Sequence, residues 1–435
     1  MNDKKINAKY LIIGNGAAAI NAVSAIRDND PSGSMVLVAK EPQHTYSRPL
    51  ISYRLAGKVT DAGMDYRSRD FYQVNNVRAM LGVDVTRLET ASRLAICSDG
   101  TTIQFEKLLI ATGGSPIKPP IPGLEAVGVF TFTTWDDEIA IDQYIQNIQK
   151  TGAPRGAVVL GGGLIGLKSV EAMVHRGIAV TVVELADRVL AVTFDKEASA
   201  LAEKSLAGKG VAIRTNNTVK QVVAERGVIR AVILNDGEKI DCDLLILAIG
   251  VRPDVTLLAG TDIRTDRGVV VDSSMATNVA GIYAAGDVAQ AEDALTGKSR
   301  PIPILPAAAK QGRIAGVNMA GGAATYEGGI PMNAVDVVGL PTISVGQTVE
   351  QDGDEVLKRT DAKTGAYRKI VLRDVRVIGA IFIGQIERAG IFTGLIRSKL
   401  DVSSFKDLLL SDEFGLLSLP SDYRAHMVRG AGIEV

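Results

Sequence analysis

The chain has 435 residues, which is too long for one hydrophobic core and typical of two or three domains. Its 48 Lys and Arg against 49 Asp and Glu leave no field of one sign, which disfavours nucleic acid or a membrane surface as a partner. No apolar run reaches the roughly 18 residues that span a bilayer, and the N-terminus lacks the apolar segment of a signal peptide. With two cysteines far apart, the composition predicts a cytoplasmic protein.

Two strand–glycine–helix–strand units stand out, over residues 10–39 and residues 157–183. Such βαβ units imply parallel sheets with right-handed crossovers. Their first glycines, Gly14 and Gly161, lie 147 residues apart (161 − 14), which is too far for a solenoid repeat. The predicted fold is therefore α/β, with two Rossmann-like dinucleotide-binding domains.

The first glycine turn begins at Gly14 and reads G-N-G-A-A-A. Gly14 permits the tight turn, and Gly16 lets the backbone approach a pyrophosphate. The helix that follows, from Ala17 and Ala18, presents its N-terminus to the phosphates. Glu41 follows the second strand, where its carboxylate could accept a ribose hydroxyl. Taken alone, so short a pattern also fits a tight turn without a ligand.

Two linkers are expected between the two domains. Four prolines crowd into residues 116–122, which is typical of a stiff linker or crossover. A second crossover candidate, Gly250–Pro253, follows the apolar strand expected at residues 244–249.

The second glycine turn reads G-G-G-L-I-G from Gly161 and has the full context of the dinucleotide fingerprint. Gly161, Gly163 and Gly166 have the required spacing, with Ile165 between the last two, and Glu184 ends the next strand about 20 residues on. A carboxylate there accepts bonds from a 2′-hydroxyl and repels a 2′-phosphate, which favours NAD(H). An arginine four residues further on leaves NADP(H) as the alternative.

The pattern changes from about residue 325. Residues 342–345, 367–372 and 375–383 are rich in β-branched side chains, and a short turn joins the last two segments. These segments predict an antiparallel sheet, followed by a mostly helical tail. We expect a third domain there.

Further motifs, in the right order, make the chain resemble the pyridine nucleotide–disulfide oxidoreductase superfamily over nearly its whole length. Residues 111–114, Ala-Thr-Gly-Gly, resemble the turn that rests against FAD, and residues 247–253 resemble the second crossover. Residues 277–287 are similar to the second FAD motif, whose Asp binds the ribityl–pyrophosphate region. Residues 307–316 are similar to the helix whose N-terminus faces the flavin pyrimidine.

Within this superfamily, residues 44–49 resemble the Tyr-x-Arg-Pro segment of rubredoxin, ferredoxin and nitrite reductase-type flavoproteins, and of FAD subunits of anaerobic iron–sulfur oxidoreductase complexes. The resemblance implies FAD and NAD(H) as cofactors. Beyond the residues of the two glycine units, the cofactor contacts that we predict are Arg48, Pro49, Val85, Ala111, Thr112, Gly113, Gly250, Gly286, Asp287 and Ala307.

Two departures from the superfamily pattern matter for the chemistry. No Cys-x-x-Cys or Cys-x4-Cys pair occurs, and Cys97 and Cys242 lie in strand-like apolar contexts, which predicts inert thiols. The superfamily usually carries a Glu after the second glycine motif, paired with a Lys after Arg-Pro-x-x-Ser. Here those positions hold Lys168 and Tyr53, which leaves one cation near the predicted flavin–nicotinamide junction. Lys168 and Arg48 are our catalytic candidates, although an ordinary surface Lys fits the first position equally well.

The domain prediction follows from these assignments. Residues 1–120 and 258–325 form the FAD-binding domain, residues 121–257 the inserted NAD-binding domain, and residues 326–435 a C-terminal α+β interface domain. Electrons would pass between NAD(H) and FAD and then leave the flavin directly, because no cysteine relay is available.

The expected function is electron transfer between NADH or NAD+ and a one-electron carrier. That carrier would be rubredoxin, ferredoxin or an iron–sulfur partner subunit, and the chain would form a homodimer or a permanent hetero-complex. Two alternatives remain open at this point: an NADH oxidase that uses dioxygen, and a non-catalytic, NAD-responsive assembly subunit. The sequence shows no metal-ligand spacing.

Overall fold

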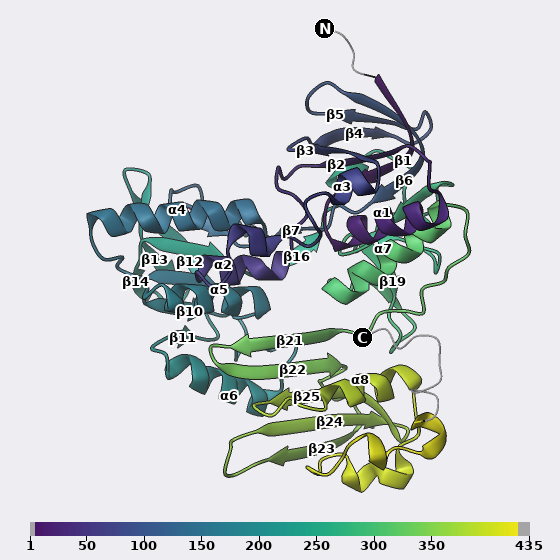
Figure 1. The fold of residues 1–435 in the computed structure, drawn as a ribbon. Helices are drawn as coiled ribbons and strands as arrows, with labels where there is room; N and C mark the ends of the chain where they lie inside the picture. Colours follow the sequence, from purple (N-terminus) through teal and green to yellow (C-terminus); the bar gives the residue numbers. More distant parts are fainter. Residues whose placement is uncertain (1–4, 425–435) are drawn as a thin grey trace. The chain divides into compact units, whose positions relative to one another are not determined.

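The structure is a computed structural model that describes residues 5–424. The chain divides into two compact units, one of Met1–Leu185 with Gly210–Gly329 and one of Ala186–Lys209 with Ile330–Val435. The backbone therefore passes between the units three times. Within the first unit, we call the elements around its seven-stranded sheet the first subdomain and those around its five-stranded parallel sheet the second subdomain (Figure 1).

The first subdomain is built on a mixed sheet of order β3-β2-β1-β6-β5-β4, with β18 also paired to β6. Strands β1, β2, β3, β6 and β18 run parallel, whereas β4 and β5 form an antiparallel extension. The strands are β1 (Lys5–Ile13), β2 (Met35–Ala39), β3 (Val77–Leu81), β4 (Val85–Glu89), β5 (Leu94–Cys97), β6 (Thr102–Ile110) and β18 (Ile282–Ala284). The parallel core agrees with the predicted βαβ unit.

Helices α1 (Ala17–Asn29) and α7 (Leu305–Met319) pack directly on each other in the first subdomain (Figure 1). Their close approach depends on two glycines of α7. A Cβ at Gly312 would lie 2.0 Å from the carbonyl oxygen of Ala18, and one at Gly316 would lie 2.6 Å from that of Ala22. Helix α7 therefore joins the first βαβ unit to a segment that is almost 300 residues further along the chain.

Smaller elements complete the first subdomain. They are the 3₁₀ helices η1 (Arg48–Leu50), η2 (Asp61–Met64) and η3 (Thr256–Leu258), the short helices α2 (Ile51–Leu55) and α3 (Phe71–Val74), and the strands β17 (Val269–Val270), β19 (Ala289–Glu292) and β20 (Ser299–Arg300). Helix α2 contacts α4 and α5 of the second subdomain.

The second subdomain has an all-parallel sheet of order β11-β10-β9-β15-β8. An antiparallel sheet, β12-β13-β14, follows β11 along the chain. The elements are β8 (Val129–Thr131), α4 (Trp135–Thr151), β9 (Ala157–Leu160), α5 (Leu164–His175), β10 (Val180–Val183), β11 (Ala212–Arg214), β12 (Val219–Glu225), β13 (Val228–Leu234), β14 (Lys239–Asp241) and β15 (Leu244–Leu247). Strands β9 and β15 are buried throughout, as expected for the centre of a parallel sheet.

The two predicted crossovers lie side by side. Strand β7 (Gly114–Pro116) pairs antiparallel with β16 (Val251–Pro253), so the linkers that lead into and out of the second subdomain form a two-stranded ribbon. Gly250, with φ +125°, precedes β16, and its carbonyl accepts a hydrogen bond of 3.0 Å from the Ile117 backbone N–H.

The second unit contains the antiparallel sheet β21-β22-β25-β24-β23. Its strands are β21 (Met332–Val337), β22 (Leu340–Gly346), β23 (Glu355–Thr360), β24 (Tyr367–Arg373) and β25 (Arg376–Ile383). The unit also contains helices α6 (Lys196–Ala207) and α8 (Ala389–Ser398). Asp374 and Val375, which join β24 to β25, have φ values of 47° and 58°, as a tight hairpin turn requires. The predicted antiparallel sheet is present.

The prediction of a mostly helical tail was wrong for the chain between α8 and residue 420. That stretch contains only the 3₁₀ helices η4 (Ser403–Leu408) and η5 (Leu416–Ser418). Short polar side chains bind the local backbone instead. Asp401 accepts a hydrogen bond of 2.8 Å from the Ser403 N–H, and Ser418 Oγ accepts one of 3.2 Å from the Gly415 N–H. Such bonds compete with a regular helix.

Candidate dinucleotide sites and the contacts between them

The first glycine turn forms an open cradle at the start of α1. Gly14 has φ +118°, and a Cβ there would lie 2.1 Å from the carbonyl oxygen of Ala111. Around Gly16, by contrast, no heavy atom of the described chain lies within 4 Å of an added Cβ. No side chain among residues 5–424 caps the α1 N-terminus. Its backbone N–H groups can therefore receive an anion that approaches Gly16.

The second glycine turn repeats this geometry at the start of α5. Gly161 has φ +112°, and a Cβ there would lie 2.3 Å from the carbonyl oxygen of Ala248, whereas the space around Gly163 is open to 4 Å within the described chain. A Cβ at Gly166 would lie 1.9 Å from the carbonyl oxygen of Gly161, so this glycine permits the close packing of helix on strand. Glu184 accepts a hydrogen bond of 2.6 Å from the Gly162 N–H, which places its carboxylate at the turn.

Gly286 and Asp287 lie where β18 leads away from the first sheet, close to the first turn. The Gly286 N–H donates to Gln311 Oε1 at 2.9 Å, and a Cβ at Gly286 would lie 3.0 Å from that of Ala18. Across residues 5–424, no group donates a hydrogen bond to the Asp287 carboxylate, and burial raises its pKa while Arg48 opposes that rise. An acceptor with this environment suits hydroxyl groups of a bound ligand.

The Ala111–Gly113 turn closes the other side of the first glycine turn. Ala111 donates its N–H to the carbonyl of Ile13 at 2.8 Å, which continues the β1–β6 pairing to the turn itself. Thr112 Oγ1 donates to the carbonyl of Asp254 at 2.8 Å, and Gly113 has φ +73°. This turn therefore ties the first glycine cradle to the chain that returns from the second subdomain.

Glu41 is engaged by protein groups at both carboxylate oxygens. Tyr46 Oη donates to Glu41 Oε2 at 2.5 Å, and an Arg48 guanidinium nitrogen lies 2.9 Å from Glu41 Oε1. Tyr46 Oη also accepts the Trp135 N–H at 3.0 Å, and Arg48 donates to the carbonyl of Thr133. The segment that contains Arg48 and the exposed Pro49 therefore links the first subdomain to the start of α4.

The structure brings Lys168 and Tyr53 together, as their superfamily positions predict. Lys168 Nζ lies 4.4 Å from the centre of the Tyr53 ring. Two residues that the sequence reasoning missed complete this cluster. Glu171, one turn along α5, forms an ion pair with Lys168 and a second one with Lys58 at 3.0 Å. The i, i+3 spacing of Lys168 and Glu171 was the available signal for the first pair.

A second ion pair connects α2 to the second subdomain. Arg54 contacts Glu138 of α4 and also Asp61, and its guanidinium lies 5.7 Å from the centre of the Trp135 ring. Glu138 is fully buried, and burial raises its pKa to about 7, against the opposing effect of Arg54. Arg176, the C-cap of α5, donates to the carbonyl of Leu55, the last residue of α2, at 3.1 Å.

Three other predicted site residues are buried or half-buried apolar side chains. Val85 is buried in the core on one face of the first sheet, and Ala307 is buried in the first turn of α7. No side chain among the described residues caps the α7 N-terminus. Ile165 lies half-buried in the first turn of α5. Gly16, Gly163 and Ala307 therefore lie at the N-termini of α1, α5 and α7, whereas Val85 belongs to the core of the first sheet.

The two cysteines are buried and unpaired by disulfide. Burial raises the pKa of the Cys97 thiol to about 11 and that of the Cys242 thiol to about 12. Because the thiolate is the reactive form, neither thiol suits electron relay near neutral pH. No group of three or more metal-ligating side chains occurs in residues 5–424, and no helix there is both long and apolar enough to cross a membrane.

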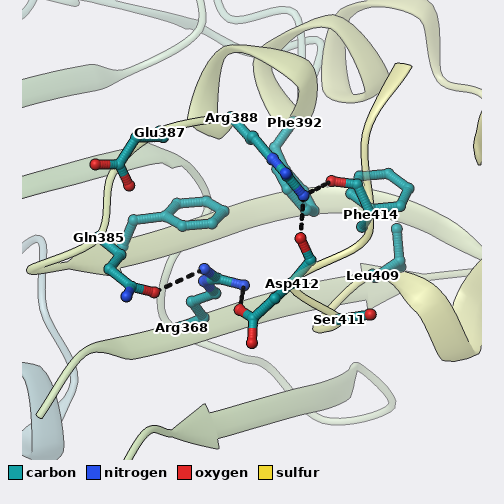
Figure 2. Close-up of a pocket in the computed structure, with 10 residues that line it drawn as sticks. Arg368, Gln385, Glu387, Arg388, Phe392, Leu409, Ser411, Asp412 and Phe414 are labelled. Carbon is teal, nitrogen blue, oxygen red and sulfur yellow. Dashed lines mark hydrogen bonds and ion pairs between the residues drawn. The ribbon is translucent and has the colours of Figure 1, made fainter. Parts of the chain in front are cut away.

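A cavity of about 310 Å³ lies in the second unit, and none of the predicted site residues lines it. Figure 2 shows Arg368 between Gln385 and Asp412, while Arg388 points toward the carbonyl groups of Asp412 and Phe414. Both guanidinium groups are thus engaged by the protein itself.

Two sheets with parallel strands, each next to a glycine cradle at a helix N-terminus that no described side chain caps, define a class of protein with two dinucleotide sites. Residues 8–321 match the family model described as pyridine nucleotide-disulphide oxidoreductase. The chain belongs to that family. Residues 331–400 match the rubredoxin NAD+ reductase C-terminal domain.

Relatives support this assignment over most of the chain. The epsilon subunit of NADH-dependent phenylglyoxylate dehydrogenase from Aromatoleum evansii is 32% identical, with 93% of this chain and 95% of that protein covered. Rubredoxin-NAD(+) reductase from Pseudomonas putida is 28% identical, with 89% and 98% covered. A chain of the covalent putidaredoxin reductase–putidaredoxin complex superposes with a TM-score of 0.81 at 25% identity, covering 91% and 94%.

The chain is therefore an NAD(H)-dependent flavoprotein oxidoreductase with FAD and NAD(H) as cofactors. The described residues fit both groups. Each cradle leaves open space where a Cβ would stand at Gly16 or Gly163, and each helix N-terminus offers N–H groups to a pyrophosphate. The Asp287 carboxylate adds an acceptor without a protein donor among residues 5–424.

Proposed function

We propose that this flavoprotein transfers electrons between NAD(H) and a one-electron carrier, namely rubredoxin, ferredoxin or an iron–sulfur partner subunit. The observation that carries the proposal is the combination of two open dinucleotide cradles with two buried, high-pKa thiols. Without a thiol relay, electrons must leave the flavin directly. The electron-transfer roles in the names of its relatives support a protein partner.

The proposed domains follow the two cradles. Residues 1–120 and 258–325 bind FAD, residues 121–257 bind NAD(H) except for residues 186–209, which pack in the second unit, and residues 326–435 form an interface domain. When bound, the two cofactors supply the hydride and electron chemistry, so the protein has to bind and align them. We assign the Gly14–Gly16 and Gly161–Gly166 turns to the two pyrophosphates, and Asp287 to the hydroxyls of FAD.

Lys168 and Arg48 are the proposed residues at the flavin–nicotinamide junction. Lys168 is the fifth residue of α5, and Arg48 lies in the segment that joins Glu41 to the start of α4. Each is a cation at a contact between the two subdomains. Their proposed role is to orient the bound rings by charge and hydrogen bonding.

We infer a preference for NADH over NADPH. The Glu184 carboxylate lies at the second glycine turn, 2.6 Å from the Gly162 N–H, where it would meet the 2′ position of a bound nucleotide. A phosphate at that position would place like charges together. Rapid mixing of the flavin-loaded protein should show faster flavin bleaching with NADH than with NADPH at equal concentration; equal rates, or faster bleaching by NADPH, would overturn the inference.

The experiment that tests the proposed function is anaerobic reduction followed by acceptor mixing. NADH should bleach the flavin. Oxidised rubredoxin or ferredoxin should then reoxidise all of the reduced flavin. Rapid reoxidation by dioxygen with neither protein able to compete would instead favour an NADH oxidase. Failure of NADH to reduce a fully loaded flavin would favour the non-catalytic assembly subunit.

We also propose that the chain works as a homodimer or in a permanent hetero-complex. Phe405, Leu409, Phe414 and Leu419 are buried in the second unit, but Leu416 and Leu417 expose 50% and 85% of their surface. Such side chains suit an interface. Sedimentation of the isolated chain and of the native material tests this idea. A monomer in both preparations, fully active toward its natural acceptor, would contradict it.

A further inference from the structure

We propose that Glu171 is a positioning residue that holds Lys168 in place and, through Lys58, sets the register between the FAD and NAD(H) subdomains. The inference rests on the proposed function, because Lys168 is a proposed junction residue. It concerns side chains that the two dinucleotide motifs do not include.

The two carboxylate oxygens of Glu171 serve different subdomains. Oε2 pairs with Lys168, which lies three residues earlier on α5, and Oε1 lies 3.0 Å from Nζ of Lys58, just beyond α2 in the first subdomain. The Glu171 side chain is only 8% exposed, whereas that of Lys58 is 38% exposed. Glu171 is therefore the buried centre of a bridge between the subdomains.

The charge balance of this cluster requires the carboxylate to stay ionised. Burial alone raises the pKa of Glu171, but hydrogen bonds from Lys168 and Lys58 outweigh it and leave that pKa below its usual value. His175 Nε2, one turn further along α5, lies 3.9 Å from Glu171 Oε1. Removing one lysine would leave the buried charge with a single strong partner.

The Tyr53 ring gives the bridge its geometry. Lys168 Nζ lies 4.4 Å from the ring centre and Lys58 Nζ lies 5.8 Å from it, so both ammonium groups flank the same ring as well as the same carboxylate. A cation over an aromatic face is attracted to it. Two attractive contacts thus hold Lys168, one from Glu171 on its own helix and one from the Tyr53 ring of α2.

Helix α2 is tied to the second subdomain by several polar contacts. The C-terminal end of this short helix of the first subdomain is bound to Glu138 of α4 through Arg54, and through the Leu55 carbonyl to Arg176, the C-cap of α5. Lys58 adds the connection to Glu171 directly after it. The connections converge on a helix too short to be stable alone, so its position depends on the charges of the second subdomain.

The first experiment measures where Lys168 is, without using catalysis. Acetylation of surface amines on the intact protein, quantified by mass spectrometry, should modify Lys168 about fivefold faster in Glu171→Gln than in the wild type, because the shielding ion pair is lost. The matched control is Asp30→Asn, which breaks the Lys9–Asp30 pair of 2.7 Å within the first subdomain. That control should leave Lys168 labelling unchanged.

The second experiment separates positioning from binding. Lys58→Met keeps the Lys168–Glu171 pair but removes the bridge, and should lower the limiting rate of flavin reduction about tenfold with little change in NADH affinity. Lys58→Arg should restore most of the rate. Lys9→Met, which removes a lysine of similar exposure, should have no effect.

The outcomes distinguish this inference from the proposed function. If NADH does not reduce the wild-type flavin, the proposed function fails, while the labelling result still tests Glu171. If the wild type is reduced normally and neither Glu171→Gln nor Lys58→Met changes labelling or rate, the positioning role is wrong. A Glu171→Gln protein that does not fold leaves Lys58→Met and Lys58→Arg to decide.

Discussion

At the scale of single residues, the site is defined by acidic groups in contrasting environments. Glu41, Glu138 and Glu171 all have basic or hydroxyl partners from the protein. Asp287 has a distant cation, Arg48, but no hydrogen-bond donor within residues 5–424. Because buried acceptors are nearly always hydrogen-bonded in native proteins, Asp287 is the carboxylate that best suits a bound cofactor.

Asp287→Ala should remove most of the FAD from the purified protein. The change deletes an acceptor for cofactor hydroxyls, at a cost of about 1–3 kcal/mol in FAD binding. Absorbance of the flavin relative to protein gives the occupancy, and Asp287→Asn, which keeps one acceptor oxygen, should retain more. Full occupancy in the Ala variant would show that FAD binds elsewhere.

Glu138 should make stability depend on pH. Burial raises its pKa in the folded protein to about 7 from the usual 4.5, so the folded state binds the proton more tightly than the unfolded chain does. The free energy of unfolding should therefore fall by about 1–3 kcal/mol as the pH rises from about 4.5 to about 7.

Denaturant titrations across that pH range measure this effect. Glu138→Gln should flatten the decline, while Glu225→Gln, at a side chain that is 73% exposed, should not. An unchanged slope in Glu138→Gln would assign the titration to another group. Because Glu138 of α4 pairs with Arg54 of α2, Glu138→Gln also tests how much this ion pair contributes to stability.

At the scale of elements, each of the two glycine turns contains one glycine that the packing requires and one that faces open space. The first glycine of each turn is required by the protein, because a Cβ would meet a backbone carbonyl at 2.1 Å or 2.3 Å. The next one, Gly16 or Gly163, faces open space in the described chain and is therefore available to a ligand. Close packing and ligand approach are thus assigned to different residues of one turn.

Substitutions at Gly161 and Gly163 should separate these two roles. Gly161→Ala should destabilise the fold by about 1–3 kcal/mol, since it combines a positive φ with a backbone clash. Gly163→Val should leave the unfolding temperature nearly unchanged but weaken NADH binding at least about tenfold, because the side chain would occupy the phosphate position.

Thermal unfolding and NADH titration of the flavin-loaded variants are the two measurements. Gly210→Ala provides a control, because this glycine has a positive φ of 77° but lies outside both turns. If Gly163→Val binds NADH normally, the nucleotide does not approach this turn.

At the scale of the whole molecule, the chain path matters more than the order of domains in sequence. Residues 186–209 begin two residues after Glu184 of the second subdomain, yet they pack in the second unit with residues 330–435. Asp195, the N-cap of α6, accepts a hydrogen bond of 2.6 Å from Tyr367 Oη and pairs with the fully buried Lys369 at 3.2 Å. The C-terminal sheet is therefore part of the structural support of α6.

A chain that ends at Gly329 should be defective for this reason. It would leave α6 without Tyr367 and Lys369, and without the Val337 carbonyl that binds Ser205 at 3.1 Å in the full chain. Limited proteolysis should cut it within residues 186–209, and sedimentation should show aggregation. A monomeric fragment that resists cleavage there would show that α6 is stable without the C-terminal sheet.

The sequence by itself determined the βαβ units, the two glycine turns and the antiparallel C-terminal strands. These features depend on local spacing, hydrophobic periodicity and the backbone freedom of glycine, all of which are readable along the chain. The contact between Lys168 and Tyr53 could be predicted too, but only because the two residues occupy positions that are paired in the superfamily.

Only the tertiary structure decided the rest. The bridge from Lys58 through Glu171 to Lys168 joins residues 113 positions apart, and the Arg54–Glu138 pair joins residues 84 apart. Likewise, no hydrophobic periodicity in the sequence indicates that residues 186–209 pack in the second unit. Ion pairs and docking contacts between distant segments depend on which surfaces folding brings together, and a single sequence records the charges but not their neighbours.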